Sequence, residues 1–510
     1  MGIESANSSS ASSSPPPPVS GGVARNEPGW VSPALKRTLG LRTVISTSAG
    51  LTFASSTFLV VVYIGHSLTG NASWIPITIA GLLCALAAAA FTELNGMYPS
   101  AAGIRLWLQR AFGEKLALVT SLSYMSVVAL VVGAEAYVLS NVLHDAFPKI
   151  APPYWIFLML TLATVANLRG VKIAGALQDV ITYSVIVSIL VFSVIALGHA
   201  HWSVPTLTHP GSALNVASMV GFAIFLFVGF EWVTPLAEEV KEPRSIPYGM
   251  FIALGLLVIC YSLISTAMFV DGSLQAKLFG TAADRNPIPH LDFASSILGN
   301  AGRVAMIVTS ICMSLTTFNA GLLSVSRFIY ASARENALPK KLDHVSKALT
   351  PVNAIVTVYF LALAVSLFVC FTKKYVILLN IAAATESLIY AFAAACVYML
   401  RRKEASTGRP YRMWGGLWLP ALTAFLFLGV GIGVFFTDSG FDYWGAGVVL
   451  AAVVAAWFLY IQFVVMPRKE KIKAEQAAKR QSRRPPKPPV SQAVAPEKEE
   501  PEDVVEKVEA

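Results

Sequence analysis

Charged residues are scarce in this sequence. Only 13% of its 510 residues are Asp, Glu, Lys or Arg, whereas 55% are hydrophobic. A water-soluble domain carries about 25% charged residues, because its surface must remain hydrated. The shortage of charge therefore excludes a soluble globular protein and indicates an integral membrane protein.

Cysteines and catalytic motifs are also scarce. The five cysteines lie inside apolar runs, and none forms a Cys-x-x-Cys pair, so we expect core thiols rather than disulfides or metal ligands. The sequence lacks the His-Glu-x-x-His and Gly-x-Ser-x-Gly motifs of hydrolases and a pair of intramembrane aspartates. We therefore expect a protein that is not an enzyme and that holds neither a metal nor a cofactor.

The net charge of +9 comes from short basic clusters between apolar runs. These clusters contain no interleaved aromatic residues, so they do not predict binding to nucleic acid. Placing the N-terminus in the cytoplasm puts most of the 38 Lys and Arg residues on the cytoplasmic side. The positive-inside rule therefore predicts a cytoplasmic N-terminus in a cell membrane.

Twelve apolar runs approach the ~20 residues that a membrane-spanning helix needs. The runs cover residues 43–65, 74–94, 118–142, 154–168, 174–198, 214–236, 249–270, 304–330, 353–371, 375–400, 417–437 and 444–466. An even number of spans places both termini on one side. The sequence thus predicts an all-α, multi-pass integral membrane protein with twelve transmembrane helices, both termini in the cytoplasm and the plasma membrane as its location.

The two ends differ in composition from the apolar region between them. Residues 1–38 are rich in Ser and Pro, and residues 467–510 are basic at first and acidic at the end. We expect both to be disordered cytoplasmic arms around a transporter domain at 39–466, with no cleavable signal peptide. The basic part of the tail is expected either to be solvated or to lie on anionic lipid.

Two of the predicted helices contain residues that a continuous membrane helix avoids. The sixth contains Gly229, Glu231 and Pro235, and the first contains the small-residue stretch TSAGLTFASSTF. Unwound backbone at membrane depth is tolerated where it lines a cavity. Because the two helices are five apart, they predict a 5+5 inverted repeat with broken helices 1 and 6, plus two extra helices. Alternatively, the small residues only allow close packing between helices.

A broken helix offers free backbone groups to a ligand. Free N–H groups suit an anion and free carbonyls suit a cation, and an amino acid carries both charges. We expect donors on the first helix and acceptors on the sixth. The predicted substrate-binding residues are Gly50, Thr52, Ser55 and Ser56 on the first helix and Phe225, Val228 and Gly229 on the sixth.

Three carboxylates fall deep inside predicted spans, namely Glu135, Glu231 and Glu386. An ionised group at this depth costs at least ~2.5 kcal/mol, so each should face a cavity or a partner. We predict gating or proton-sensing roles for them, with protons or a cationic substrate as partners. For Glu135 and Glu386 the alternative is a protonated carboxyl bonded to a neighbouring helix. Glu238 and Glu239 are expected to pair at the cytoplasmic surface.

The segment VGFEWVTPLAEEVKEPRSIP resembles the sixth-helix signature of the amino acid-polyamine-organocation superfamily of permeases. TELNGMYPSAAGIRLWLQRAFG, NLRGVK and SVSRFIYASARENALPKKLDHVSKALTPVNA resemble further motifs of that superfamily, in the same order. The resemblance covers residues 38–466. It implies a carrier for amino acids or related amines, polyamines included, that works by alternating access. It also places Phe225 at an aromatic lid, unless this ring only packs, and Glu231 at a gating position.

The sequence departs from the superfamily in its first and fifth helices. The Gly-Ser-Gly-like turn of the first helix is replaced by a stretch with a single glycine, Gly50. The lysine that proton-coupled relatives carry in the fifth helix is replaced by Thr182 and Ser184. The resemblance therefore does not imply coupling to protons through that lysine.

The eighth helix offers hydroxyls to a possible coupling ion. Ser314, Thr316 and Thr317 resemble the residues that bind sodium in sodium-coupled relatives, although such hydroxyls often bond to their own backbone. The predicted partners are thus a small amino acid or amine, the lipid bilayer, and protons or sodium. A non-transporting amino acid sensor with the same fold is the alternative function.

Overall fold

The computed structural model describes residues 37–199, 207–270, 288–346, 349–433 and 443–482. It divides into a large unit that ends at Val465 and a small unit that begins at Met466. Within the described residues all regular elements are helices, and strand-like pairing is limited to an isolated bridge between Leu39 and Val240. The prediction of an all-α protein is confirmed for this part of the chain.

The described residues form a series of helices along the chain. In order they are α1 (Leu41–Thr52), α2 (Thr57–Leu59), η1 (Val60–Gly65), α3 (His66–Thr69), η2 (Gly70–Ala72), α4 (Trp74–Met97), α5 (Gly103–Phe112), α6 (Glu114–Ala146), α7 (Pro152–Leu168), α8 (Val171–His199), α10 (Ala213–Ala223), η3 (Ile224–Phe227), η4 (Phe230–Leu236), α11 (Ser245–Phe269), α13 (Pro289–Arg334), η5 (Lys340–Asp343), α14 (Val352–Thr372), α15 (Tyr375–Lys403), α16 (Trp418–Gly433), α17 (Tyr443–Tyr460), η7 (Ile461–Val465) and α18 (Met466–Ser482).

Most of the long helices in the described residues have the length and apolar composition of membrane spans. Nine helices are long and apolar enough to cross a bilayer, and the bent pair Leu41–Thr52 and Thr57–Ala72 makes a tenth. Two further runs of the sequence coincide with shorter apolar helices, α7 with 17 residues and α16 with 16. The chain is therefore a multi-pass membrane protein, as predicted, while the twelve-span inverted repeat stays a prediction.

The first predicted helix is broken. Helix α1 ends at Thr52, Phe53 adopts an extended conformation (φ −73°, ψ 93°), and helical structure resumes at Thr57. The two halves are bent by 52°. The Thr52 hydroxyl bonds to the carbonyl of Ala49 in the last turn, where it competes with continuation of the helix. The break predicted from small and hydroxyl residues is thus present.

The sixth predicted helix also leaves α-helical geometry. Helix α10 tightens into the 3-10 turn η3, Val228 is extended (φ −58°, ψ 122°), and Gly229 has φ 117°. The chain then continues as the 3-10 helix η4, which contains Pro235. A left-handed φ favours glycine, and proline cannot donate the hydrogen bond that an α-helix requires. Glycine and proline therefore explain why this span is interrupted.

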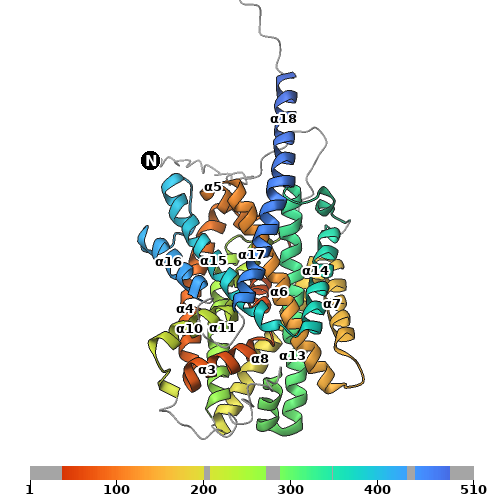
Figure 1. Ribbon diagram of the computed structural model, residues 1–510, viewed down its shortest axis with the longest axis vertical. Helices are drawn as coiled ribbons and strands as arrows, with labels where there is room; N and C mark the ends of the chain where they lie inside the picture. Colours follow the sequence, from red (N-terminus) through yellow and green to blue (C-terminus); the bar gives the residue numbers. More distant parts are fainter. Residues whose placement is uncertain (1–36, 200–206, 271–287, 347–348, 434–442, 483–510) are drawn as a thin grey trace, which may run out of the picture. The chain divides into compact units, whose positions relative to one another are not determined.

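The two broken segments lie within the bundle rather than at its edge. Helix α1 packs against α8, α11 and α13 as well as against η4. Helix α6 packs against α13, α14 and α15, and Figure 1 shows α6 and α13, in orange and green, as long neighbouring helices. The residues of both breaks, from Phe53 to Ser56 and from Val228 to Phe230, are buried.

The predicted disordered tail is helical at its start. Residues 467–482 belong to α18, which forms the small unit together with the segment that follows. This stretch is rich in Lys, Glu, Gln and Ala, which are good helix formers, and contains no glycine. The expectation of disorder is therefore wrong for these residues. Residues 1–36 and 483–510 lie outside the described residues.

Candidate functional site

The two breaks lie against each other. The hydroxyl of Ser48 on α1 donates a 2.6 Å hydrogen bond to the carbonyl of Phe230, the first residue of η4. A Cβ added to Gly229 would come within 2.8 Å of the Leu51 side chain. The backbone at Gly229 therefore lies so close to the end of α1 that a residue with a Cβ would not fit there.

A protein carboxylate binds the free amides of the first break. The backbone N–H groups of Ser55 and Ser56 donate to Oε1 and Oε2 of Glu135 at 2.8 and 2.9 Å, and the Ser314 hydroxyl also donates to Oε1. Glu135 comes from α6 and is fully buried. Ser55 and Ser56 were predicted to assist in binding the carboxylate of a substrate, and this role stays a prediction. In this structure their amides donate to Glu135.

The carbonyls around the two breaks have partners within the chain. The carbonyl of Thr52 accepts a 2.7 Å bond from the Tyr261 hydroxyl. In the second break, the Phe225 carbonyl accepts from the amide of Val228, and the Gly229 carbonyl accepts from Trp232. These carbonyls thus already accept hydrogen bonds within the chain, and their role as acceptors for a substrate stays a prediction. The role of the Phe225 ring as a lid stays a prediction.

Glu231 and Glu386 are brought together by two tyrosines. The hydroxyl of Tyr124 contacts Oε1 of Glu231 and lies 3.1 Å from Oε1 of Glu386. The hydroxyl of Tyr390 donates a 2.8 Å bond to Oε2 of Glu231. The four side chains come from α6, η4 and α15 and are all buried. We call this group the carboxyl–tyrosine cluster.

The sequence identified both carboxylates of this cluster but not the tyrosines. Tyr124 and Tyr390 lie in long apolar helices, where an isolated tyrosine usually packs as an aromatic residue. Only the packing of α6 against α15, next to Glu231, brings their hydroxyls to the carboxylates. No spacing in the sequence indicates this contact.

Buried arginines lie elsewhere and are already paired. Among the described residues, Arg105, Arg327 and Arg401 are buried. They pair with Glu335, Glu239 and Glu93 respectively. In this part of the chain Glu135 bonds to neutral hydroxyls and amides, whereas Glu231 and Glu386 interact with neutral tyrosine hydroxyls and with each other.

Glu238 and Glu239 do not pair as expected from the sequence. Glu239 forms a buried ion pair with Arg327 of α13, at 3.3 Å, and Glu238 bonds to Arg334 at 2.8 Å. These contacts tie the end of the sixth span to the end of α13. The expectation of pairing at the surface is wrong for Glu239, because the fold brings an arginine from a distant helix into contact with it.

The hydroxyls predicted to bind sodium lie near the first break but have separate partners. The Thr317 hydroxyl lies 2.8 Å from the carbonyl of Phe53 and 3.0 Å from that of Met313, and its one proton can be donated to either. Thr316 contacts the side-chain amide of Gln178 and lies 2.7 Å from the Thr182 hydroxyl. Ser314 bonds to Glu135, as described above. Sodium binding by these hydroxyls stays a prediction, and it would require some of these bonds to be exchanged.

Gln178 is a residue of this region that the sequence did not single out. Its amide nitrogen donates to the Ser46 carbonyl of α1 at 3.2 Å, and its oxygen accepts from Asn319 of α13 at 2.7 Å. A Cβ on Gly50 would lie 1.8 Å from the same amide nitrogen. Gly50 is therefore required for packing against α8, which is a different reason from the substrate contact predicted for it.

Ser184 differs from Thr182 in its surroundings. Thr182 is buried and donates to the Ser46 carbonyl at 3.1 Å, whereas Ser184 is more exposed and bonds to the carbonyl of Val180 in its own helix. Only Thr182 faces the first break. The fifth span thus presents Gln178, Thr182 and the acidic Asp179 to α1. Asp179 accepts from the hydroxyls of Thr43 and Ser46 at 3.1 and 2.5 Å.

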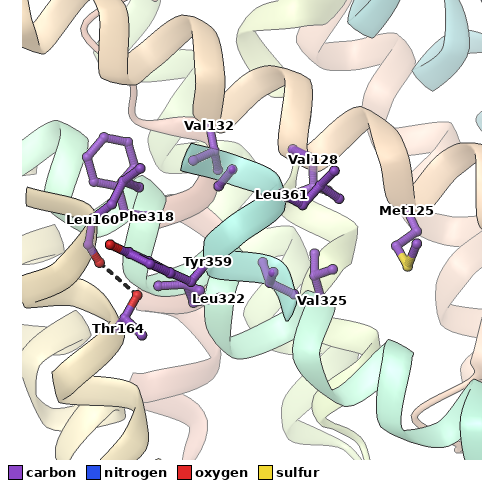
Figure 2. A pocket seen from close by; sticks show the side chains of 13 residues that line it. Met125, Val128, Val132, Leu160, Thr164, Phe318, Leu322, Val325, Tyr359 and Leu361 are labelled. Carbon is purple, nitrogen blue, oxygen red and sulfur yellow. Dashed lines mark hydrogen bonds between the residues drawn. The ribbon is translucent and has the colours of Figure 1, made fainter. Parts of the chain in front are cut away.

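An apolar pocket is lined by residues other than those of the two breaks. It is bordered by side chains of α6, α7, α13 and α14, and Figure 2 shows Val128, Val132, Phe318 and Tyr359 around it. Its lining includes none of the predicted site residues. We therefore take the two breaks, with Glu135 and the carboxyl–tyrosine cluster, as the candidate functional site.

Two broken membrane helices that meet beside buried carboxylates are typical of secondary transporters. A comparison with known families supports this class. The family described as "Amino acid permease" matches residues 39–466. This chain therefore belongs to the amino acid permease family, as the resemblance implied.

Curated relatives are similar over parts of the chain. An uncharacterized amino acid permease, YecA of Bacillus subtilis (strain 168), is 28% identical over 47% of this chain and 56% of its own length. The vacuolar cationic amino acid transporter 4 of Arabidopsis thaliana is 24% identical over 72% of this chain and 64% of its own length. The methylthioribose transporter of Bacillus subtilis (strain 168) is 26% identical over 60% and 69%. The first two matches thus span less than two thirds of those relatives.

Proposed function

We propose that this protein is a secondary active transporter that moves amino acids or related amines across a membrane by alternating access. The observation that carries the proposal is the meeting of two broken helices in the core, joined by the bond from Ser48 to Phe230. Breaks of this kind can bind a ligand with backbone groups, and their halves can move separately. Membership of the permease family and the names of the relatives support the same function.

The proposal includes the topology predicted from the sequence. Twelve spans in a 5+5 inverted repeat with two added helices would place the breaks at equivalent positions in the two halves. Both termini would lie in the cytoplasm of a plasma-membrane protein, as the distribution of Lys and Arg favours. The predicted substrate contacts at Phe225, Val228 and the first break belong to this proposal.

The carboxyl–tyrosine cluster is proposed as the proton-sensing part of the transporter. A phenol has one proton to donate, yet the Tyr124 oxygen lies within bonding reach of Glu231 and of Glu386. Tyr124 can donate to only one of the two glutamates. The carboxyl of the other must therefore carry a proton and donate it to the phenol oxygen. Because Glu231 lies in η4, directly after the second break, gain or loss of this proton can be coupled to the shape of that break.

The experiment that tests the proposal is flux into proteoliposomes. Purified protein would be reconstituted, and uptake of radiolabelled amino acids and amines would be followed with and without a proton or sodium gradient. We expect saturable uptake that empty liposomes lack. Specific binding without any flux or exchange would contradict transport and would instead support the sensor.

A further inference from the structure

We infer that the preferred substrate is an organic amine that lacks an α-carboxylate, and that Glu135 determines this preference. The inference rests on the proposed transport function and specifies the substrate class of the same site. It follows from two features of the described residues, namely the occupant of the amides at the first break and the charge of the surrounding core.

The amides of the first break are held by both oxygens of one carboxylate. Glu135 accepts from the N–H groups of Ser55 and Ser56 at 2.8 and 2.9 Å, and Ser314 adds a third donor. An α-amino acid would need donors of this kind for its own carboxylate. In this chain Glu135 already provides the carboxylate, in a position that is fully buried.

The helix that carries Glu135 fixes it in place. Glu135 lies in the middle of α6, which has 33 residues, and the neighbouring Ala134 and Ala136 are buried as well. The first break is therefore bound to α6 through a short side chain rather than through a mobile loop. A substrate carboxylate could reach the same amides only if this side chain were displaced.

The charge of the core favours a cation. Glu135, Glu231 and Glu386 are buried around the two breaks, and no basic side chain bonds to them in the described part of the chain. The buried arginines of the described residues pair with other glutamates, as shown above. The carboxylate of an amino acid would lie beside Glu135 and the Glu231–Glu386 pair without a cationic partner, whereas an ammonium group would find carboxylate acceptors.

The test compares ligands that differ only in the α-carboxylate. Suitable pairs are 1,5-diaminopentane with lysine, agmatine with arginine, and 3-methylbutylamine with leucine. Binding to the purified full-length protein would be measured by thermal shift and by competition, and uptake would be measured in proteoliposomes. We expect the amine of at least one pair to bind about tenfold more tightly than its amino acid, which corresponds to about 1.4 kcal/mol.

Glu135→Gln removes the charge but keeps a side chain of the same size. We expect it to reduce the preference for the amine about tenfold or more, mainly by weakening amine binding. Glu470→Gln, an exposed position on α18, is the matched control and should leave the preference unchanged. If Glu135→Gln does not fold, Ser314→Ala removes one donor to Glu135 and should lower the preference in the same direction.

The outcomes separate this inference from the proposed function. If the amino acids are bound and transported as well as the amines or better, the inference is wrong and the transporter stands. If neither member of any pair is bound or transported, both the inference and the proposed substrate range are wrong. The comparison in the unmodified protein decides the substrate preference even if every variant fails to fold, and the variants decide whether Glu135 determines it.

Discussion

Tyr124 is the residue that links the two buried carboxylates near the second break. Its hydroxyl reaches Glu231 and Glu386, and Tyr390 holds the other oxygen of Glu231. The thiol of Cys84 on α4 is also close enough to interact with both carboxylates. A proton shared in such a group is held by several partners, so its loss should affect helices α6, η4 and α15 together.

Neutral substitutions in this cluster should change the pH dependence of transport. Glu231→Gln keeps the shape of the side chain and removes its titration, so we expect uptake to lose most of its dependence on pH while binding weakens modestly. Glu386→Gln should have a similar effect, because Glu386 interacts with Glu231 both directly and through Tyr124. The measurement is uptake across a pH series, with Glu470→Gln as control. Unchanged profiles in both variants would show that neither carboxyl senses protons.

The ion pair between Glu239 and Arg327 is the second residue-scale feature with a measurable effect. Breaking a buried pair on one side costs ~3–5 kcal/mol, because a buried charge remains without its partner. Burial raises the pKa of Glu239, and the positive charge of Arg327 opposes this rise.

Arg327→Met should therefore lower the melting temperature of the purified protein more than the double variant Arg327→Met, Glu239→Gln does. Without Arg327 the carboxyl favours its protonated form in the fold, so the loss of stability should grow as the pH rises. Thermal melts of the single and double variants at acidic and alkaline pH measure this. If the effects of the two substitutions on the melting temperature add and do not depend on pH, the two residues do not stabilise the fold by interacting with each other.

At the scale of elements, the two broken spans are interrupted for different reasons. The first ends where Thr52 bonds back to Ala49 and Phe53 turns to an extended conformation. The second needs the left-handed conformation of Gly229 and then avoids α-helical geometry up to Pro235. Both breaks leave backbone groups to find partners outside the helix. Glu135 and Tyr261 supply them at the first break, and the Ser48 hydroxyl supplies one at the second.

Gly229→Ala is expected to damage the second break. A non-glycine residue at φ 117° costs ~1–2 kcal/mol, and its Cβ would also press on Leu51. We expect reduced stability together with a loss of uptake of about tenfold or more. Gly255→Ala, in α11 with open space around its Cα, is the matched control and should retain both. Full uptake in Gly229→Ala would mean that this conformation is not needed for transport.

At the scale of the whole molecule, the orientation in the membrane follows from charge rather than from packing. His209 is exposed in the connection before α10, and Ser406 is exposed in the connection after α15. The first connection is predicted to lie outside the cell and the second inside. These two positions therefore report the orientation directly.

Cysteine substitutions should show this orientation on intact cells. We expect His209→Cys to react with a membrane-impermeant thiol reagent, and Ser406→Cys to react only after the membrane is permeabilised. The unmodified protein measures any background from its own cysteines, three of which are buried. The reverse pattern of labelling would overturn the predicted topology.

Much of the fold could be predicted from the sequence because the bilayer restricts what an apolar segment can do. A segment of about 20 apolar residues must satisfy its backbone internally, so its helical structure follows from composition alone. The interruptions at Thr52 and Gly229 are also local, since they arise from side chains and φ angles within a few residues. The helical start of the C-terminal segment was missed because its high charge was taken as a sign of disorder.

The sequence alone therefore determined the membrane class, the helical runs, both breaks and the set of deep carboxylates. Only the tertiary structure decided which groups these carboxylates contact. It brought Tyr124 to Glu231, Arg327 to Glu239, and Glu135 to the amides of Ser55 and Ser56. Such contacts join residues that are about 80 to 110 positions apart, and they depend on how whole helices pack. No local pattern encodes that arrangement, because the hydrophobic effect that drives burial has no direction and does not choose partners for polar groups.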